Sequence, residues 1–126
     1  MNLDKVISGF FIILAMTLNF GFFYGDTESI TMHSKYELFA AIIVNIIATV
    51  LKLGDKTQIG SVLLATSLVA VIQLVAAATI WTINIQGDAA LEPEVIGLIL
   101  SLSGGALLAN ITSVWLYLGE TLKSKR

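Results

Sequence analysis

The chain has no cysteine, a single proline, a single histidine and few charged residues, which make up 13% of its 126 positions. An ordinary soluble domain is about a quarter charged. Since 56% of the residues are hydrophobic and the mean hydropathy is +0.89, a soluble domain of this size would be unable to hide its apolar surface from water. The absence of cysteine excludes a thiol nucleophile. The sequence therefore indicates an integral membrane protein.

Four long apolar stretches predict membrane-spanning helices. A bilayer core of about 30 Å requires roughly 20 helical residues, and each stretch is near or above that length. Helices are expected because unpaired backbone groups are costly in lipid, and the alternation of a barrel strand is absent. We predict an all-α polytopic protein with one transmembrane domain over residues 1–126 and a retained first helix. The four predicted spans are residues 6–24, 36–53, 60–85 and 94–118.

The basic residues are distributed unevenly between the connecting segments. Six of the seven lie before the first span, at the end of the second span, between the second and third spans, or after the fourth, and only Lys35 lies on the other side. By the positive-inside rule, the N and C termini are predicted to be cytoplasmic. The formal net charge of −2 gives no indication of nucleic-acid binding. The six residues are Lys5, Lys52, Lys56, Lys123, Lys125 and Arg126.

Proline and glycine mark the predicted helix ends. Pro93 suits the first turn of the fourth helix, where its missing N–H has no partner to lose. Gly54, Gly87 and Gly119 stand where helix C-terminal glycines are expected. The fourth helix is therefore predicted to lie between Pro93 and Gly119.

The second half of the chain repeats features of the first at an offset of 65 residues. Asn19 and Asn45 recur as Asn84 and Asn110, and Leu-Lys-Leu-Gly-Asp at 51–55 recurs as Leu-Tyr-Leu-Gly-Glu at 116–120. Coincidence among apolar residues is the alternative, but rare residue types carry this match. We predict two tandem two-helix repeats, residues 1–59 and 60–126. Two helices in each repeat give both halves the same orientation, with a pseudo-two-fold axis along the membrane normal.

Five amide side chains lie within the predicted spans. Asn45 lies nine residues before Gly54, about 13 Å along a helix and so near the midplane of the bilayer. An amide in hydrocarbon requires a hydrogen-bond partner, so these side chains either hold helices together or line a polar pathway. We predict a hydrogen bond between Asn45 and Asn110 across the pseudo-two-fold axis. The five amides are Asn19, Asn45, Gln73, Asn84 and Asn110.

The fourth span carries a small residue at every fourth position, a pattern that permits close approach of another helix. This row is predicted to face either another subunit or the second span, through Ala41, Asn45 and Thr49. We expect Gly105→Leu to block assembly if the row lies between subunits. The small-residue row consists of Gly97, Ser101, Gly105, Ala109 and Ser113.

Side chains that carry chemistry are scarce within the spans. Lysine, histidine and carboxylates are absent from their centres, and charged residues such as Lys52 stand at span ends. The chain also lacks paired carboxylates on one helix face and a phosphate-binding Gly-Lys-Ser/Thr motif. We predict no catalytic, cofactor-binding or metal-binding residue and no enzymatic activity. The lack of deep charge argues against ion-coupled transport by a monomer.

Two segments resemble known families. Leu-Gly-Asp-Lys-Thr-Gln-Ile-Gly at 53–60 and Leu-Ser-Gly-Gly-Ala-Leu-Leu-Ala-Asn at 102–110, together with the length and four spans, are similar to a family of short, uncharacterised bacterial inner-membrane proteins. That resemblance implies a location in the bacterial plasma membrane. Residues 54–58 locally resemble the Glu-x-Gly-Asp-Lys-Thr signature of a manganese and calcium transporter family. Lys52 stands where that family has its glutamate, so we expect no cation site at Asp55.

Two classes of function fit the sequence. In the first, the protein is a non-enzymatic accessory or assembly subunit of a larger membrane complex such as an ion transporter. In the second, it is a homo-oligomeric channel or carrier for a small ion or neutral solute, with Asn45, Gln73 and Asn110 along the path. We favour the first class, because a pathway through four helices without deep charge would require oligomerisation. The expected partners are the lipid bilayer and either a larger membrane protein or further copies of the chain.

Overall fold

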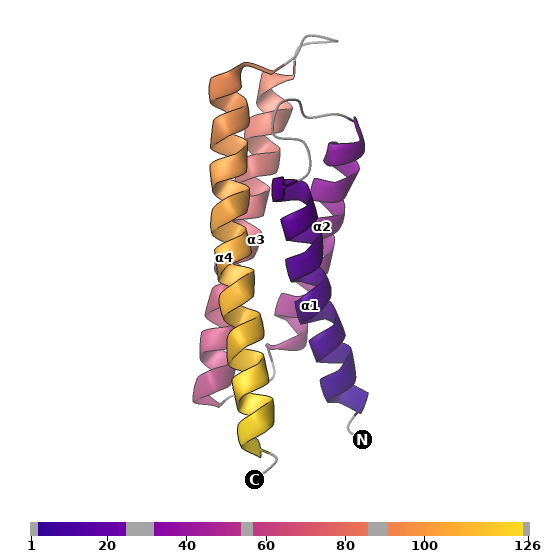
Figure 1. The fold of residues 1–126 in the computed structure, drawn as a ribbon, viewed down its shortest axis with the longest axis vertical. Coiled ribbons are helices and arrows are strands. Elements are labelled where there is room, and N and C mark those ends of the chain that lie inside the picture. The colour runs from indigo at the N-terminus through magenta and orange to yellow at the C-terminus, as the bar shows by residue number, and fades with distance from the viewer. Residues whose placement is uncertain (1–2, 25–31, 54–56, 86–90, 125–126) are drawn as a thin grey trace.

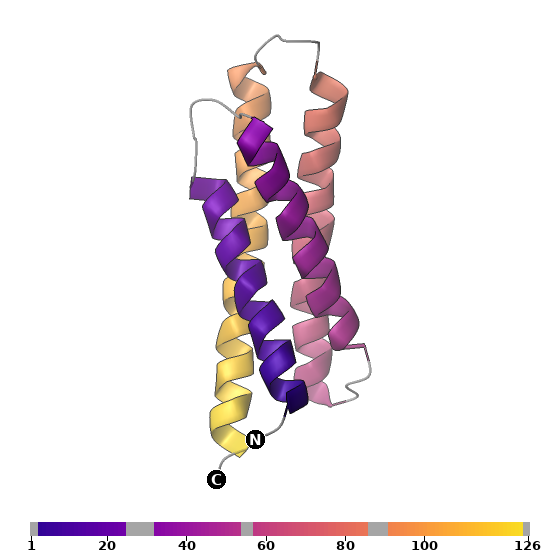
Figure 2. The ribbon, with the colours of Figure 1, turned by 90° about the vertical axis from the view of Figure 1, so that its right-hand side faces the viewer.

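The protein is an up-and-down bundle of four helices (Figure 1), and the predicted all-α class is confirmed. A computed structural model describes residues 3–24, 32–53, 57–85 and 91–124. The helices are α1 (Leu3–Tyr24), α2 (Met32–Leu51), α3 (Gln58–Asn84) and α4 (Pro93–Ser124). Successive helices run antiparallel, so both ends of the chain lie at the same end of the bundle (Figure 2). We call it the terminal end.

Three of these helices, α1, α3 and α4, are long and apolar enough to cross a membrane. The second predicted span, residues 36–53, corresponds to α2, which is the shortest helix at 20 residues. Its described side chains begin at Lys35. Whether α2 crosses the bilayer stays a prediction.

Two helix starts follow the expected local chemistry. Thr57 caps α3, because its hydroxyl oxygen accepts a hydrogen bond from the Gly60 N–H at 3.0 Å. Pro93 is the first residue of α4, as predicted. The carbonyl oxygen of Glu92 accepts hydrogen bonds from the backbone N–H groups of the first turn of α4.

The predicted end of the fourth helix at Gly119 is wrong, because α4 continues to Ser124. A Cβ atom at Gly119 would meet nothing within 4 Å, so neither a turn nor a close contact calls for glycine there. Lys123 in the last turn interacts favourably with the helix dipole. Gly54 and Gly87, the other two predicted terminal glycines, lie outside the described residues.

The helices are arranged so that each packs against two others. α1 and α3 both contact α2 and α4, whereas α2 and α4 lie diagonally opposite each other in the described part of the bundle. The small-residue row of α4 therefore cannot face Ala41, Asn45 and Thr49 of α2, and that prediction is wrong. In this up-and-down order, successive helices are neighbours, which leaves the second and fourth helices apart.

Small side chains fill the helix contacts, and large apolar side chains point outward. In the described part of the chain, six hydrophobic residues are 0% exposed; four of them are alanines, and the other two are Leu74 and Ile99. By contrast, Ile72 is 65% exposed, Leu108 67% and Trp115 77%. An outer surface this rich in apolar groups suits contact with lipid chains better than contact with water.

Hydroxyl groups on the outer surface bond to their own helices. Each of four exposed threonines donates a hydrogen bond of 2.8–2.9 Å to a backbone carbonyl three or four residues earlier. Such hydroxyls are satisfied without water, as a lipid-facing position requires. These residues are Thr17, Thr79, Thr82 and Thr112.

Candidate functional site

Asn19 on α1 and Asn110 on α4 form a hydrogen-bonded amide pair inside the bundle. Their side chains are 0% and 3% exposed. In the amide orientation that satisfies its neighbours, Asn19 Oδ1 accepts from Asn110 Nδ2 and from the Leu107 N–H, each at 3.0 Å. Asn19 Nδ2 donates to the Ser103 carbonyl at 3.1 Å. Because Asn110 Nδ2 also donates to the Ala15 carbonyl, the two amides join α1 to α4.

Asn45 is also buried but bonds within its own helix. The side-chain Nδ2 of Asn45 donates to the Ala41 backbone carbonyl at 2.7 Å. The backbone carbonyl of Asn45 accepts from the Thr49 hydroxyl at 2.8 Å. The predicted hydrogen bond between Asn45 and Asn110 is therefore wrong. Since α2 and α4 are diagonal, Asn110 instead finds its partner on the adjacent α1.

The remaining two predicted amides lie apart from this pair. Asn84 is exposed near the end of α3, and its Nδ2 donates to the Ile80 carbonyl at 2.8 Å. Gln73 is half-buried, and its amide lies against Gly105 of α4. Its Oε1 atom is buried and has no hydrogen-bond partner in the part of the chain that the structure describes. Of the five amides, only Asn19 and Asn110 are brought together.

The small-residue row of α4 lies against α3 over more than half its length. Gly105 packs under the Gln73 amide, and Ala109 packs against the central core. The Ser113 hydroxyl shares a hydrogen bond with the Thr66 hydroxyl of α3. Only the two residues of the row nearest the start of α4, Gly97 and Ser101, are exposed.

Lys52 is a candidate functional residue that the sequence analysis treated only as a boundary marker. It follows directly on α2, but its side chain turns into the bundle and the residue is 6% exposed. Lys52 Nζ donates to Ser67 Oγ of α3 at 2.8 Å. Ser67 lies nine residues after the first residue of α3, which is about 14 Å along the helix. The ammonium group therefore lies well inside the bundle.

The helical spacing of α2 contains a signal for this burial. Buried residues recur at intervals of three and four residues along one face of the helix, and Lys52 continues that series one position beyond its last turn. Charge alone made the residue look like a marker of the membrane surface, whereas its spacing places it on the inward face. The series is Leu38, Ala41, Asn45, Ala48 and Lys52.

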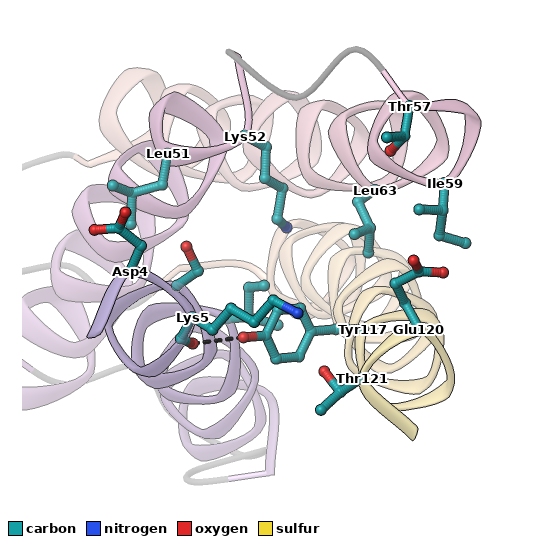
Figure 3. Close-up of a pocket in the computed structure, with 12 residues that line it drawn as sticks. Asp4, Lys5, Leu51, Lys52, Thr57, Ile59, Leu63, Tyr117, Glu120 and Thr121 are labelled. Carbon is teal, nitrogen blue, oxygen red and sulfur yellow. Dashed lines mark hydrogen bonds between the residues drawn. The ribbon is translucent and has the colours of Figure 1, made fainter. Parts of the chain in front are cut away.

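A recess of about 250 Å³, lined by both apolar and polar side chains, lies at the terminal end of the bundle (Figure 3). It forms because α2 stops short of α3 and α4 at that end (Figure 1). The Tyr117 hydroxyl donates to the Lys5 carbonyl and joins α4 to α1 on one side. The lining of this terminal recess includes Asp4, Lys5, Lys52, Thr57, Tyr117 and Glu120.

The chemistry of the terminal recess is that of a binding site with donors on its walls. Two ammonium groups and several hydroxyls can donate hydrogen bonds, and Lys52 supplies a charge removed from water. Within the described residues, no group of three or more His, Cys, Asp or Glu side chains could hold a metal ion. Residues 54–56, which carry the transporter-like signature, lie outside the described ranges.

Comparisons with known proteins identify a family without identifying an activity. Residues 32–121 match the model of a family of unknown function, DUF6394. The matched region includes α2 and α3 and most of α4. No curated protein and no solved structure matches the chain.

Proposed function

The chain belongs to the DUF6394 family, whose function is unknown, and we propose that it is a non-enzymatic accessory or assembly subunit of a larger membrane complex, such as an ion transporter. In this proposal all four helices cross the bacterial plasma membrane, with both termini cytoplasmic. The partners are the lipid bilayer and a larger membrane protein.

The proposed topology is supported by the shape of the bundle and the placement of charge. α2 packs between α1 and α3, antiparallel to both, so it lies beside two helices of membrane-spanning length (Figure 2). Of the four basic residues that the structure describes, Lys5, Lys52 and Lys123 lie toward the terminal end of the bundle and Lys35 lies toward the other end. By the positive-inside rule, that end faces the cytoplasm.

A tandem origin of the two halves, residues 1–59 and 60–126, is supported by equivalent buried positions in α2 and α4. The buried series from Leu38 to Lys52 is matched, 65 positions later, by residues of α4 that are buried or, for Tyr117, half-buried. The α2 series from Leu38 to Lys52 corresponds in order to Ser103, Ala106, Asn110, Ser113 and Tyr117.

The hydrogen bonds made by the interior amides are the observation that favours one of the two classes of function. Asn19, Asn45 and Asn110 point into the monomer and are hydrogen-bonded there. A homo-oligomeric pore lined by these amides would require them to face a shared axis outside the monomer. The side chains of Asn19 and Asn110 instead join α1 to α4, and that of Asn45 bonds within α2, which favours a packed subunit over a pore-forming one.

The surface left for docking is the exposed part of the small-residue row. Gly97 has nothing within 4 Å of its Cβ position, and Ser101 is exposed. Gly105 and Ser113 are already used against α3. A partner helix would therefore approach α4 near Gly97 and Ser101, at the end of the bundle away from the termini.

Native mass spectrometry of gently solubilised protein tests this proposal. A larger subunit that co-purifies with the chain is the expected result, and a lone symmetric oligomer would overturn it. Gly97→Leu should weaken the complex because it blocks close helix approach. Ala65→Leu, which enlarges an exposed small residue on α3, is the matched control and should leave the complex intact.

Cysteine labelling tests the topology, because the natural chain has no cysteine. A thiol introduced by Glu92→Cys, at the end away from the termini, should react with an impermeant reagent in intact cells. A thiol introduced by Lys123→Cys, at the terminal end, should react only after the membrane is opened. The reverse labelling pattern would contradict cytoplasmic termini.

The terminal recess favours one alternative, a channel or carrier for a small ion or neutral solute. Lys52 places a charge inside the bundle, which the sequence analysis did not expect. Solute flux in proteoliposomes that depends on Lys52 would support the carrier. Absence of flux alongside a co-purifying subunit would support the accessory role.

A further inference from the structure

Among the residues that the structure describes, the ammonium group of Lys52 has no charged partner that accounts for its burial. Lysine is almost never fully buried unless it is paired, and at a helix end its side chain ordinarily extends toward water. Lys52 instead points into the bundle, where its described hydrogen-bond partner is the uncharged Ser67 hydroxyl. An ammonium held this way is strongly destabilised unless an anion or water reaches it.

The two carboxylates of the terminal recess do not neutralise this charge. Neither Asp4 nor Glu120 forms an ion pair with Lys52 in the part of the chain that the structure describes. Figure 3 shows them on opposite sides of the recess, with Lys52 Nζ pointing toward the middle. An ammonium has three N–H donors, and Ser67 accepts from one of them. Two donors are therefore left for a group that enters the recess.

The recess has the size and wall chemistry to admit such a group. Its volume of about 250 Å³ is several times the roughly 30 Å³ that one water molecule occupies in the liquid. The second ammonium, that of Lys5, lines it together with the hydroxyls of Thr57 and Tyr117, of which the Tyr117 O–H already donates to the Lys5 carbonyl. Phosphate oxygens accept hydrogen bonds from ammonium and hydroxyl groups and form the stronger, charge-assisted kind with ammonium.

We propose that the terminal recess binds the phosphate group of an anionic phospholipid, with Lys52 donating to a phosphate oxygen. The headgroup would enter between the helix ends where α2 stops short, and its acyl chains would remain against the apolar outer surface. The anion would then supply the counter-charge that the described residues do not provide for Lys52.

The position of the recess favours a lipid over a free anion. Three helices of membrane-spanning length place the ends of the bundle near the two bilayer surfaces, where phospholipid phosphates are concentrated. Three of the four basic residues that the structure describes lie toward the terminal end, and basic groups between helices on that side of a membrane recruit anionic headgroups. The carboxylates of Asp4 and Glu120 disfavour a free anion, whereas a lipid is also held by its chains.

Native mass spectrometry of the full chain in mild detergent tests the proposal with three probes, phosphatidylglycerol, phosphatidylcholine and inorganic phosphate. The wild-type chain should retain phosphatidylglycerol more strongly than phosphatidylcholine. Lys52→Gln should weaken phosphatidylglycerol binding about tenfold or more, as expected for loss of a hydrogen bond to a charged group. Lys123→Gln removes a basic residue of the same end that does not line the recess, and should change binding less than about threefold.

Three results would overturn the assignment. They are unchanged phosphatidylglycerol binding by Lys52→Gln, equal binding of both lipids, and displacement of phosphatidylglycerol by the same concentration of inorganic phosphate. Lys52→Met, which keeps an apolar stem without charge, should lose binding equally while unfolding at no lower temperature than wild type without lipid. The inference relies on the proposed membrane topology, but not on the proposed partner, because lipid binding is measured on the isolated chain.

Discussion

Replacing Gly105 by leucine should destabilise the bundle itself. A Cβ atom at this position would lie 2.7 Å from Nε2 and 2.9 Å from Oε1 of Gln73, closer than such atoms pack. Overpacking a helix contact typically costs about 1–3 kcal/mol. The Gln73 amide is the end of a flexible side chain and can move partly aside, and leucine gains up to about 1 kcal/mol over glycine in helix propensity. We therefore expect a net loss of up to about 2 kcal/mol in the free energy of unfolding.

Gly97→Leu is the matched control on the same helix. No atom lies within 4 Å of the Cβ position of Gly97, so this variant gains helix propensity without a clash and should be as stable as wild type or slightly more. The free energy of unfolding can be measured for both variants by far-UV circular dichroism during SDS titration in detergent. If Gly105→Leu unfolds at the same SDS fraction as Gly97→Leu, the packing of the small-residue row against α3 is refuted.

A second substitution identifies the group responsible for the clash. Gln73→Ala removes four heavy atoms from the contact, the same number that Gly105→Leu adds. The double variant should recover most of the lost stability, with a coupling energy of about 1–3 kcal/mol between the two positions. Gln73→Ala alone should cost little, because the buried Oε1 has no hydrogen-bond partner to lose in the described part of the chain. Additive effects of the two substitutions would contradict this explanation.

Three further substitutions test other contacts by the same unfolding measurement. Asn19→Ala should lower the free energy of unfolding by about 1–3 kcal/mol, because it leaves the Asn110 amide and α4 backbone groups without their partner. The control Asn84→Ala, at an exposed position, should change it by less than about 0.5 kcal/mol. Equal effects would show that the amide pair does not hold α1 to α4. Lys52→Met should raise the free energy of unfolding in lipid-free detergent by about 1 kcal/mol or more, since it removes a buried charge. A loss of stability would contradict the inference that this charge is uncompensated. Tyr117→Phe should cost about 0.5–1.5 kcal/mol through the lost hydrogen bond to the Lys5 carbonyl, and an unchanged midpoint would show that this contact is not stabilising.

The placement of the helices along the chain followed from local sequence features. Long apolar stretches predicted four helices, and Pro93 predicted the start of the last one. Gly119 was misleading because glycine at an exposed helix position is tolerated when nothing packs against it. Local signals therefore located the helices well and the last helix end poorly.

The partners of the interior side chains could not be read from spacing. Periodicity shows which face of a helix is apolar, but not which helix covers that face. Asn110 was expected to meet Asn45 because the two are equivalent in the repeat, yet it bonds to Asn19 on the adjacent α1. The small-residue row was expected to face α2 or another subunit, yet its residues Gly105 and Ser113 pack on α3.

The sequence by itself determined the apolar character of the chain, its all-α class and the alternation of its helices, because these depend on composition and on runs of neighbouring residues. Only the tertiary structure decided where Lys52 points. The few charges of the chain all looked like markers of the membrane surface, but α2 is shorter than α3 and α4, and its inward face ends on a lysine. Since helix lengths and bundle order together set what lies beside that residue, its burial against Ser67 became visible only once the helices were packed.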